Sequence, residues 1–246
     1  MRLYMAQPIP LIVDRRGSVL NLSLNNPEKR NALNTEMMGA LVATIEEAKN
    51  YNQLRVIVIQ GKGDVFCSGA DLNSWEPKQL QQLLKVISEC PIPTVAHVHG
   101  VCLGGGMGLI SACDFVVAEK ETTFGFPEIQ IGMIPAIIYP YISSKLNSST
   151  IRELFITGER FDNQRAMDLG LLHHNSNIQS LISLIKKGGP LAQKQVKAML
   201  SSEVLSKPME ERDMQLANLI TKIKESEECK EGINSFLEKR NPGWVK

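Results

Sequence analysis

Three short segments of this sequence carry residues whose types and spacing could do chemistry, and the first is a glycine cluster. Gly104, Gly105 and Gly106 stand between a segment expected to be a buried strand and one expected to be helical. A helix that begins there presents bare backbone N–H groups at the positive end of its dipole, and the missing Cβ atoms let a ligand approach closely. The cluster lacks the spacing of a dinucleotide fingerprint and the Lys-Ser/Thr pair of a phosphate loop. It therefore predicts either an amide site for an anionic atom or a close contact between helix and sheet.

The second segment, residues 67–72, has the sequence Cys-Ser-Gly-Ala-Asp-Leu and follows another expected strand. Its small residues also leave backbone amides accessible, and Asp71 can cap the turn that follows. A covalent mechanism would need Cys67 or Ser68 beside a positioned base, but the sequence has no G-x-S-x-G elbow and no recognisable triad. Backbone amides are therefore the groups expected to act here.

The third segment, residues 124–129, places one carboxylate among apolar side chains. Glu128 follows Phe124 and Phe126 and precedes Ile129. An acid in apolar surroundings has its pKa raised toward neutrality, which suits a general acid or base. The alternative is an ordinary glutamate at the exposed end of a loop.

The elements that must position these segments follow from hydrophobic periodicity. Residues 11–13 and 19–24 predict a hairpin, and β-branched runs predict buried strands at 56–59, 94–99 and 115–118. Helices are expected at about 34–50, 77–89 and 107–113, so the core should be a mostly parallel α/β sheet. From about residue 135 the strand signal disappears. Helical patterns then cover 151–157, 164–169, 178–187, 191–200 and 209–237.

Composition narrows the kind of protein. The chain has 246 residues with 27 basic and 26 acidic side chains, a formal net charge of +1. This balance gives no overall field that would recruit nucleic acid or an anionic membrane. Five cysteines without a C-x-x-C pair indicate reduced thiols, and no metal-ligand spacing is present. With no apolar run of about 18 residues and no secretory signal, the expected location is the cytoplasm.

Taken together, the three segments resemble the enoyl-CoA hydratase/isomerase (crotonase) superfamily. Their order and spacing match, as do residues 25–33, 157–161, 166–171 and 231–240, so the similarity covers nearly the whole chain. The resemblance implies an α/β fold built as a crotonase-like spiral of ββα turns with a helical C-terminal region. Residues 1–186 would form the spiral core and residues 187–246 a trimerisation region. A homotrimer or a dimer of trimers is the implied assembly.

The resemblance also implies a substrate and roles for particular residues. Such proteins bind acyl-CoA thioesters, so coenzyme A would be part of the substrate and no separate cofactor is expected. The amides of Ala70 and Gly105 would hold the thioester oxygen as an enolate forms, an interaction worth ~3–4 kcal/mol for each donor. Glu128 matches a catalytic glutamate of the family. The implied coenzyme A contacts are Ser68, Asp71 and Leu72 and, reaching a neighbouring subunit, Phe236 and Lys239.

One position departs from the family pattern. Typical hydratases carry a second glutamate just after the glycine cluster, and here that position is Gly108. Our first expectation is addition of water to a 2-enoyl-CoA, including branched, methylglutaconyl-type substrates. The alternatives are Δ3-Δ2 enoyl-CoA isomerisation with one glutamate, decarboxylation of a methylglutaconyl thioester, and a catalytically silent acyl-CoA-binding protein. Glu119 and Glu121 are expected to be solvated rather than to replace the lost acid.

Overall fold

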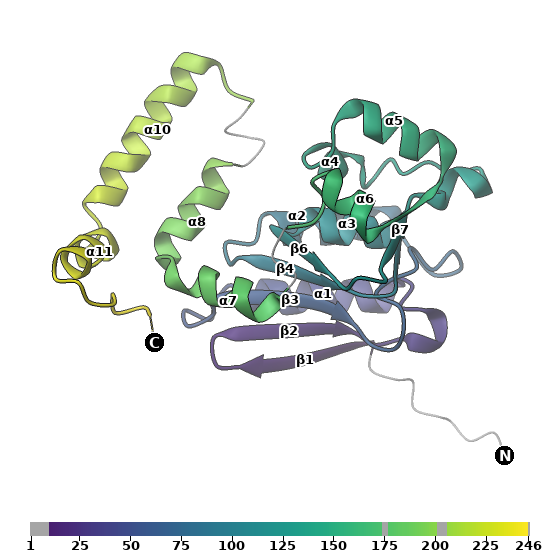
Figure 1. The fold of residues 1–246 in the computed structure, drawn as a ribbon, viewed down its shortest axis with the longest axis horizontal. Helices are drawn as coiled ribbons and strands as arrows, with labels where there is room; N and C mark the ends of the chain where they lie inside the picture. The colour runs from purple at the N-terminus through teal and green to yellow at the C-terminus, as the bar shows by residue number, and fades with distance from the viewer. Residues whose placement is uncertain (1–9, 174–176, 201–205, 246) are drawn as a thin grey trace.

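The larger of two sheets has five strands in the order β1-β2-β3-β4-β6 (Figure 1). The computed structural model describes residues 10–173, 177–200 and 206–245. Strands β1 and β2 form the expected antiparallel hairpin, and β2, β3, β4 and β6 run parallel. The mostly parallel core predicted from the β-branched runs is therefore confirmed. The strands are β1 (Leu11–Arg16), β2 (Val19–Leu24), β3 (Val56–Gly61), β4 (Thr94–Val98) and β6 (Phe115–Ala118).

A second sheet of three short strands, in the order β5-β7-β8, stands beside the first. It contains β5 (Val101–Leu103), β7 (Thr123–Gly125) and β8 (Arg160–Asp162). The chain crosses between the sheets at Gly100, whose φ of +60° and contact with the Asp64 carbonyl leave no room for a side chain. It then returns through a helix to β6 and crosses again to β7, so successive turns supply one strand to each sheet. The expectation of no strand after residue 135 was wrong, because β8 pairs antiparallel with β7.

Helices cover both faces of the larger sheet. On one face, side chains of α1, α2 and α3 join the main hydrophobic core with Leu22, Ile57 and Ile59. On the other face, α7 packs Leu181 and neighbouring residues against the valines of β3, β4 and β6. The bounds are α1 (Thr35–Ala48), α2 (Pro77–Ser88), α3 (Gly105–Ala112), α4 (Tyr139–Ser143), α5 (Ser148–Thr157), α6 (Asn163–Asp168) and α7 (Ile178–Lys187), with short 3₁₀ turns η1 (Pro27–Lys29) and η2 (Pro127–Ile131).

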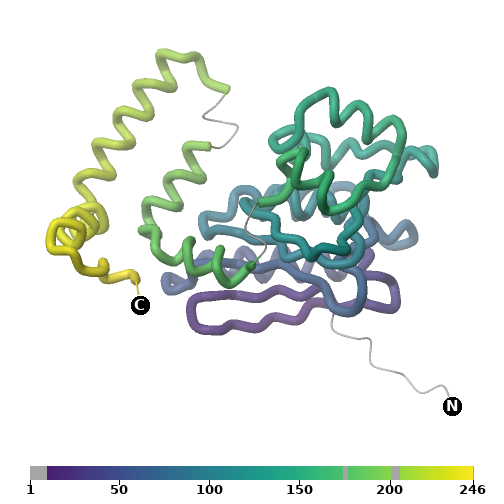
Figure 2. Tube along the Cα trace, viewed as in Figure 1, coloured from purple at the N-terminus to yellow at the C-terminus, as the bar shows by residue number. Residues whose placement is uncertain are grey.

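The last helices form an arm beside the core. Figure 2 shows the chain leaving the core after α7 and running through α8 (Pro190–Met199), α10 (Met209–Lys224) and α11 (Glu227–Leu237). The single helix expected over 209–237 is thus two. The side chain of Ser226 accepts a hydrogen bond from the Cys229 amide and so caps a new helix. Within the described ranges, no helix is both long and apolar enough to span a membrane.

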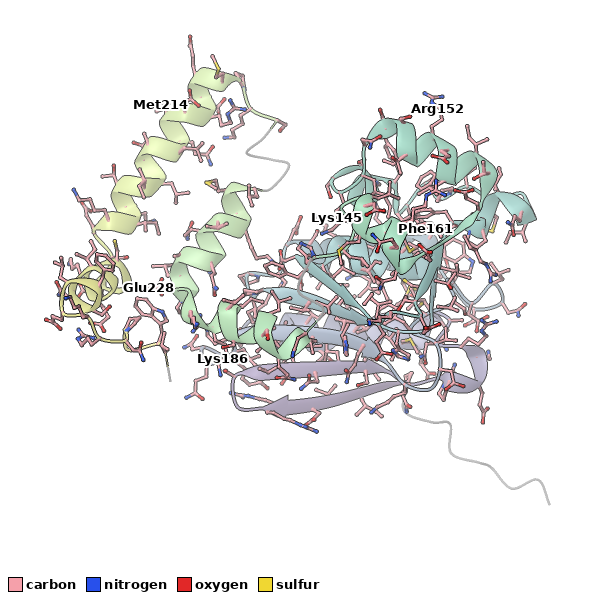
Figure 3. The ribbon with its side chains drawn as sticks, viewed as in Figure 1. Lys145, Arg152, Phe161, Lys186, Met214 and Glu228 are labelled. Carbon is pink, nitrogen blue, oxygen red and sulfur yellow. The ribbon has the colours of Figure 1, made fainter. Side chains whose placement is uncertain are left out.

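Polar contacts tie this arm to the core. The guanidinium of buried Arg55 donates to the carbonyls of Ile185, Lys186 and Gly188 at the end of α7, and to that of Trp244 in the C-terminal tail. Elsewhere the ammonium of Lys197 on α8 pairs with the Asp114 carboxylate beside β6. Figure 3 shows Lys186 and Glu228 in this region, and the Glu228 carboxylate accepts from the amides of Leu191 and Ala192 at the start of α8. The start of the arm is therefore fixed by hydrogen bonds rather than by a large apolar contact.

Candidate active site

Two turns of the backbone, residues 67–71 and 103–106, meet at the start of α3. A Cβ placed on Gly105 would lie 3.4 Å from the Ala70 nitrogen, and one placed on Gly69 would lie 3.8 Å from the Gly105 nitrogen. These are ordinary van der Waals separations, so the two turns lie in direct contact. The two predicted amide donors therefore belong to adjacent backbone segments.

Hydrogen bonding around Ala70 decides which way its amide faces. Leu33 forms an isolated parallel bridge with Ala70, in which the Leu33 amide donates to Gly69 O at 2.8 Å and the Asp71 amide donates to Leu33 O at 3.0 Å. In a parallel pairing, one residue exchanges hydrogen bonds with the two residues that flank its counterpart, and the counterpart directs its own N–H away from that strand. The Ala70 N–H is thus directed away from Leu33. Gly105 is the first residue of α3, so its N–H has no acceptor within the helix.

Glu128 lies on η2 and reaches the same place. Its Oε1 is 3.0 Å from the position that a Cβ on Gly104 would occupy, and Gly104 itself has φ +49°. Its Oε2 is buried and has no hydrogen-bond partner among the described residues. Burial raises the pKa of Glu128, partly offset by a hydrogen bond from its own backbone amide. The loop-end alternative from the sequence does not hold, and the environment suits an acid or base.

These groups border one cavity of about 200 Å³. Glu128 is the one ionisable side chain among the described residues that line it. The remaining walls are backbone and apolar side chains, with Ser68 and Gln130 as the other polar side chains. The lining residues are Ser68, Gly69, Ala70, Leu72, Trp75, Leu80, Gly104, Gly105, Pro127, Glu128, Gln130, Ile131, Met133, Ile134, Pro135, Ala136, Ile137 and Ile138.

The space beside Gly108 is filled by another side chain. A Cβ at position 108 would lie 2.4 Å from Cγ2 of Ile138 and 3.2 Å from Cδ1 of Leu84. Ile138 is itself buried in the main core. Glu119 and Glu121, as expected, are exposed. The described residues thus provide no carboxylate where typical hydratases carry the second one.

Two residues that were not among the predicted site residues hold the neighbourhood of residues 67–71, the amide loop, in place. Asn31 is fully buried with φ +53°, a region that asparagine tolerates. Its amide group donates to the carbonyls of Lys62 and Val65 at 2.8 and 2.7 Å. Lys29 pairs with Asp71 at 3.0 Å, which lowers the pKa of that carboxyl. Both lie in the 25–33 stretch that carries the family resemblance, which is the signal that could have found them.

The other predicted site residues fall into two groups. Ser68 and Leu72 line the cavity, whereas Asp71 is turned to Lys29 and to the Asn73 amide. Phe236 is 81% exposed near the end of α11, and Lys239 follows that helix. In Figure 1, α11 lies far to the left of α3 and α4. A single chain therefore does not bring these two residues to the cavity. Their coenzyme A contacts stay predictions.

The structure gives no support to a covalent nucleophile at residue 67. The Cys67 thiol is fully buried, and its closest polar contact is the Gly69 carbonyl at 3.7 Å. Burial raises its pKa to about 12, so the reactive thiolate is strongly disfavoured. Across the described ranges, His, Cys, Asp and Glu side chains form no group of three that could hold a metal ion.

Comparisons with known proteins agree on one family and one fold. A family described as Enoyl-CoA hydratase/isomerase matches residues 14–246. The 2,3-dehydroadipyl-CoA hydratase of Escherichia coli is 34% identical over 95% of this chain and 98% of its own length. The enoyl-CoA isomerase/hydratase fer4 of Mycosarcoma maydis is 30% identical over 91% of each chain. An enoyl-CoA hydratase structure from Shewanella pealeana superposes with a TM-score of 0.90 at 29% identity, covering 97% of both chains. This likeness confirms the expected crotonase-like fold.

Proposed function

This chain belongs to the enoyl-CoA hydratase/isomerase family, and on that premise we propose that its cavity binds an acyl-CoA thioester and moves a proton on the acyl carbons near the carbonyl. The thioester oxygen accepts hydrogen bonds from the amides of Ala70 and Gly105. Both amides belong to backbone that is fixed before substrate arrives, so no reorganisation is needed as negative charge develops. Donors of this kind lower the barrier by ~3–4 kcal/mol each.

Glu128 is the acid–base group in this proposal. Its carboxylate lies against Gly104, next to the amide that binds the oxygen, so it faces the carbons adjacent to the thioester carbonyl. Because its pKa is raised by burial, the carboxylate is a stronger base than a solvated glutamate. The same group, once protonated, is a neutral acid that the apolar cavity tolerates.

Isomerisation of a 3-enoyl-CoA to a 2-enoyl-CoA is the reaction that this geometry supports best. Glu128 takes a proton from C2, and the electron pair delocalises over C2–C4 and onto the thioester oxygen. The proton then returns from Glu128 to C4, and the double bond moves from C3–C4 to C2–C3. One carboxylate serves both steps. The observation that carries this choice is Ile138 occupying the space where a second acid would project from position 108.

Hydration of a 2-enoyl-CoA, our first expectation from the sequence, is the second candidate. Glu128 alone would take a proton from water as the water oxygen bonds to C3, and would then deliver that proton to C2. The name of the Escherichia coli relative, a hydratase at 34% identity, favours it. It ranks second because no other carboxylate of the described lining residues could hold the attacking water.

A panel of short 2-enoyl-CoA and 3-enoyl-CoA thioesters separates the candidates. Conversion of the 3-enoyl set supports isomerisation, and hydration of the 2-enoyl set without isomerisation refutes it. The Glu128→Gln variant should lose at least ~100-fold in kcat while still binding a saturated acyl-CoA. Glu121→Gln, which changes an exposed glutamate, is the matched control and should retain full activity. Binding without any turnover would indicate the silent acyl-CoA-binding alternative.

A further inference from the structure

We infer, on the basis of the proposed function, that the acyl group of the substrate is uncharged and aliphatic, and that thioesters of dicarboxylic acids are excluded. The large apolar side chains that line the cavity include Trp75, Leu80, Ile134, Ile137 and Ile138. No lysine, arginine or histidine is present among the described residues that line the cavity. An acyl chain that enters it meets mostly hydrocarbon, and apart from Glu128 the polar groups of the walls are uncharged.

A second carboxylate on the substrate would meet no cation among the described residues that line this cavity. Moving an ion out of water costs several kcal/mol unless an opposite charge or hydrogen bonds replace the solvent. The one charged group present is the Glu128 carboxylate, which would repel a second anion. Gln130, one of the two other polar side chains, already donates to the Gly158 carbonyl at 3.0 Å.

The lysine that pairs with Asp71 of the loop at residues 67–71 is already engaged. Lys29 pairs with Asp71 at 3.0 Å, and Asp71 also accepts from the Asn73 amide. Asp71 is buried, so taking Lys29 away would leave an unpaired internal carboxylate. Lys29 is therefore held as a structural partner and does not serve as a substrate cation.

This inference separates the chain from two of the substrates considered above. A methylglutaconyl thioester carries a free carboxylate, so the branched substrate expected from the sequence is disfavoured. The Escherichia coli relative is named for a dehydroadipyl thioester, which also ends in a carboxylate. The apolar walls of residues 133–138 favour a chain that ends in a methyl group.

Binding of matched saturated thioesters tests the inference independently of turnover. Hexanoyl-CoA and adipyl-CoA have acyl chains of equal length and differ at the far end by a methyl group against a carboxylate. Isothermal titration should show that hexanoyl-CoA binds at least ~30-fold more tightly than adipyl-CoA. A 30-fold ratio corresponds to about 2 kcal/mol, which is less than the full cost of burying an unpaired charge. Equal affinities, or tighter binding of adipyl-CoA, overturn it.

A cation placed in the wall should weaken the preference for hexanoyl-CoA. Ala136 is exposed and lines the cavity, so Ala136→Arg introduces a charge without disturbing the buried core. Its affinity for adipyl-CoA relative to hexanoyl-CoA should rise at least ~10-fold, whereas Ala136→Met, the uncharged control, should leave the ratio unchanged. An unchanged ratio in Ala136→Arg, or an equal rise in Ala136→Met, counts against the inference.

These outcomes separate the inference from the proposed function. Tight hexanoyl-CoA binding without turnover of any enoyl-CoA refutes the catalytic proposal and leaves the acyl preference standing. Turnover of both neutral and dicarboxylic substrates at equal kcat/KM refutes the preference and leaves the catalytic proposal standing. Binding of neither thioester overturns both.

Discussion

Replacing Gly108 by alanine should destabilise the protein, although alanine normally stabilises a helix interior. The added Cβ would lie 2.4 Å from Cγ2 of Ile138, whereas carbon atoms prefer a separation of about 3.5–4.0 Å. Ile138 is buried and has little freedom to move. Overpacking of this kind costs about 1–3 kcal/mol, which outweighs the roughly 0.5–1 kcal/mol that alanine contributes through helix propensity.

The sign of the effect should reverse when Ile138 is shortened. Ile138→Ala removes Cγ2 and by itself costs about 2–5 kcal/mol. In that background the Cβ of residue 108 lies 3.1 Å from Cβ of residue 138 and 3.2 Å from the flexible end of Leu84, contacts that movements of a few tenths of an ångström relieve. Gly108→Ala should then be neutral or stabilising by up to about 1 kcal/mol. The coupling energy between the two positions is therefore expected to exceed about 1 kcal/mol.

Urea denaturation of the four proteins in this cycle measures the coupling, with equal m-values as the check that the unfolded states are comparable. Gly39→Ala provides the matched control, since Gly39 lies within α1 and nothing stands within 4 Å of an added Cβ. That change should stabilise by about 0.5–1 kcal/mol. If Gly108→Ala behaves like Gly39→Ala, Ile138 does not fill the side-chain space at position 108. The preference for isomerisation over hydration then loses its structural basis.

Three further outcomes follow from buried polar groups. The acidic limb of kcat/KM should lie above pH 4.5, the ordinary pKa of a glutamate, because burial raises the pKa of Glu128. Protonated Glu128 contributes this stability in full below its pKa in the unfolded chain, and the contribution is lost as the pH rises through its pKa in the folded protein. Glu128→Gln should therefore raise the free energy of unfolding more at pH 8 than at pH 4. Asn31→Gly still allows the positive φ at this position but removes three side-chain hydrogen bonds. Urea unfolding should show that the free energy of unfolding falls by about 2–4 kcal/mol, whereas Asn50→Ala at an exposed position should change it little. Arg55→Met should cost about 2–4 kcal/mol and speed hydrogen exchange in α7 and α8, whereas exposed Arg16→Met should do neither.

The sequence predicted the larger sheet because β3, β4 and β6 are buried runs rich in β-branched residues, and β1 and β2 flank a short turn as a hairpin. The second sheet was missed because its strands have three residues each and no periodic pattern to detect. One of them, Arg160–Asp162, gains its pairing only when β7 is already in place. The break at Ser226 was missed because a helix cap competes weakly with a long helical pattern on either side.

Residue types identified the candidate groups, but only the tertiary contacts show which side chains fill the space around them. Gly104, Gly105 and Glu128 were candidates because of small side chains and an isolated charge. Nothing local to Gly108 reveals that Ile138, thirty positions later, fills its side-chain space. The catalytic roles of Ala70, Gly105 and Glu128 remain predictions of the proposed mechanism.

The hydrogen bonds of Arg55 have a consequence for how the chain folds. Its partners lie 130 to 189 positions later in the sequence. During synthesis the sheet that carries Arg55 emerges long before those carbonyls, so its guanidinium must stay hydrated at the edge of an otherwise apolar face. Docking of α7 and the tail is then a late step that removes the water and completes the structure. A nascent chain halted before residue 185 would leave the valines of β3, β4 and β6 uncovered, an apolar face with one charge at its edge that is prone to association with other hydrophobic chains.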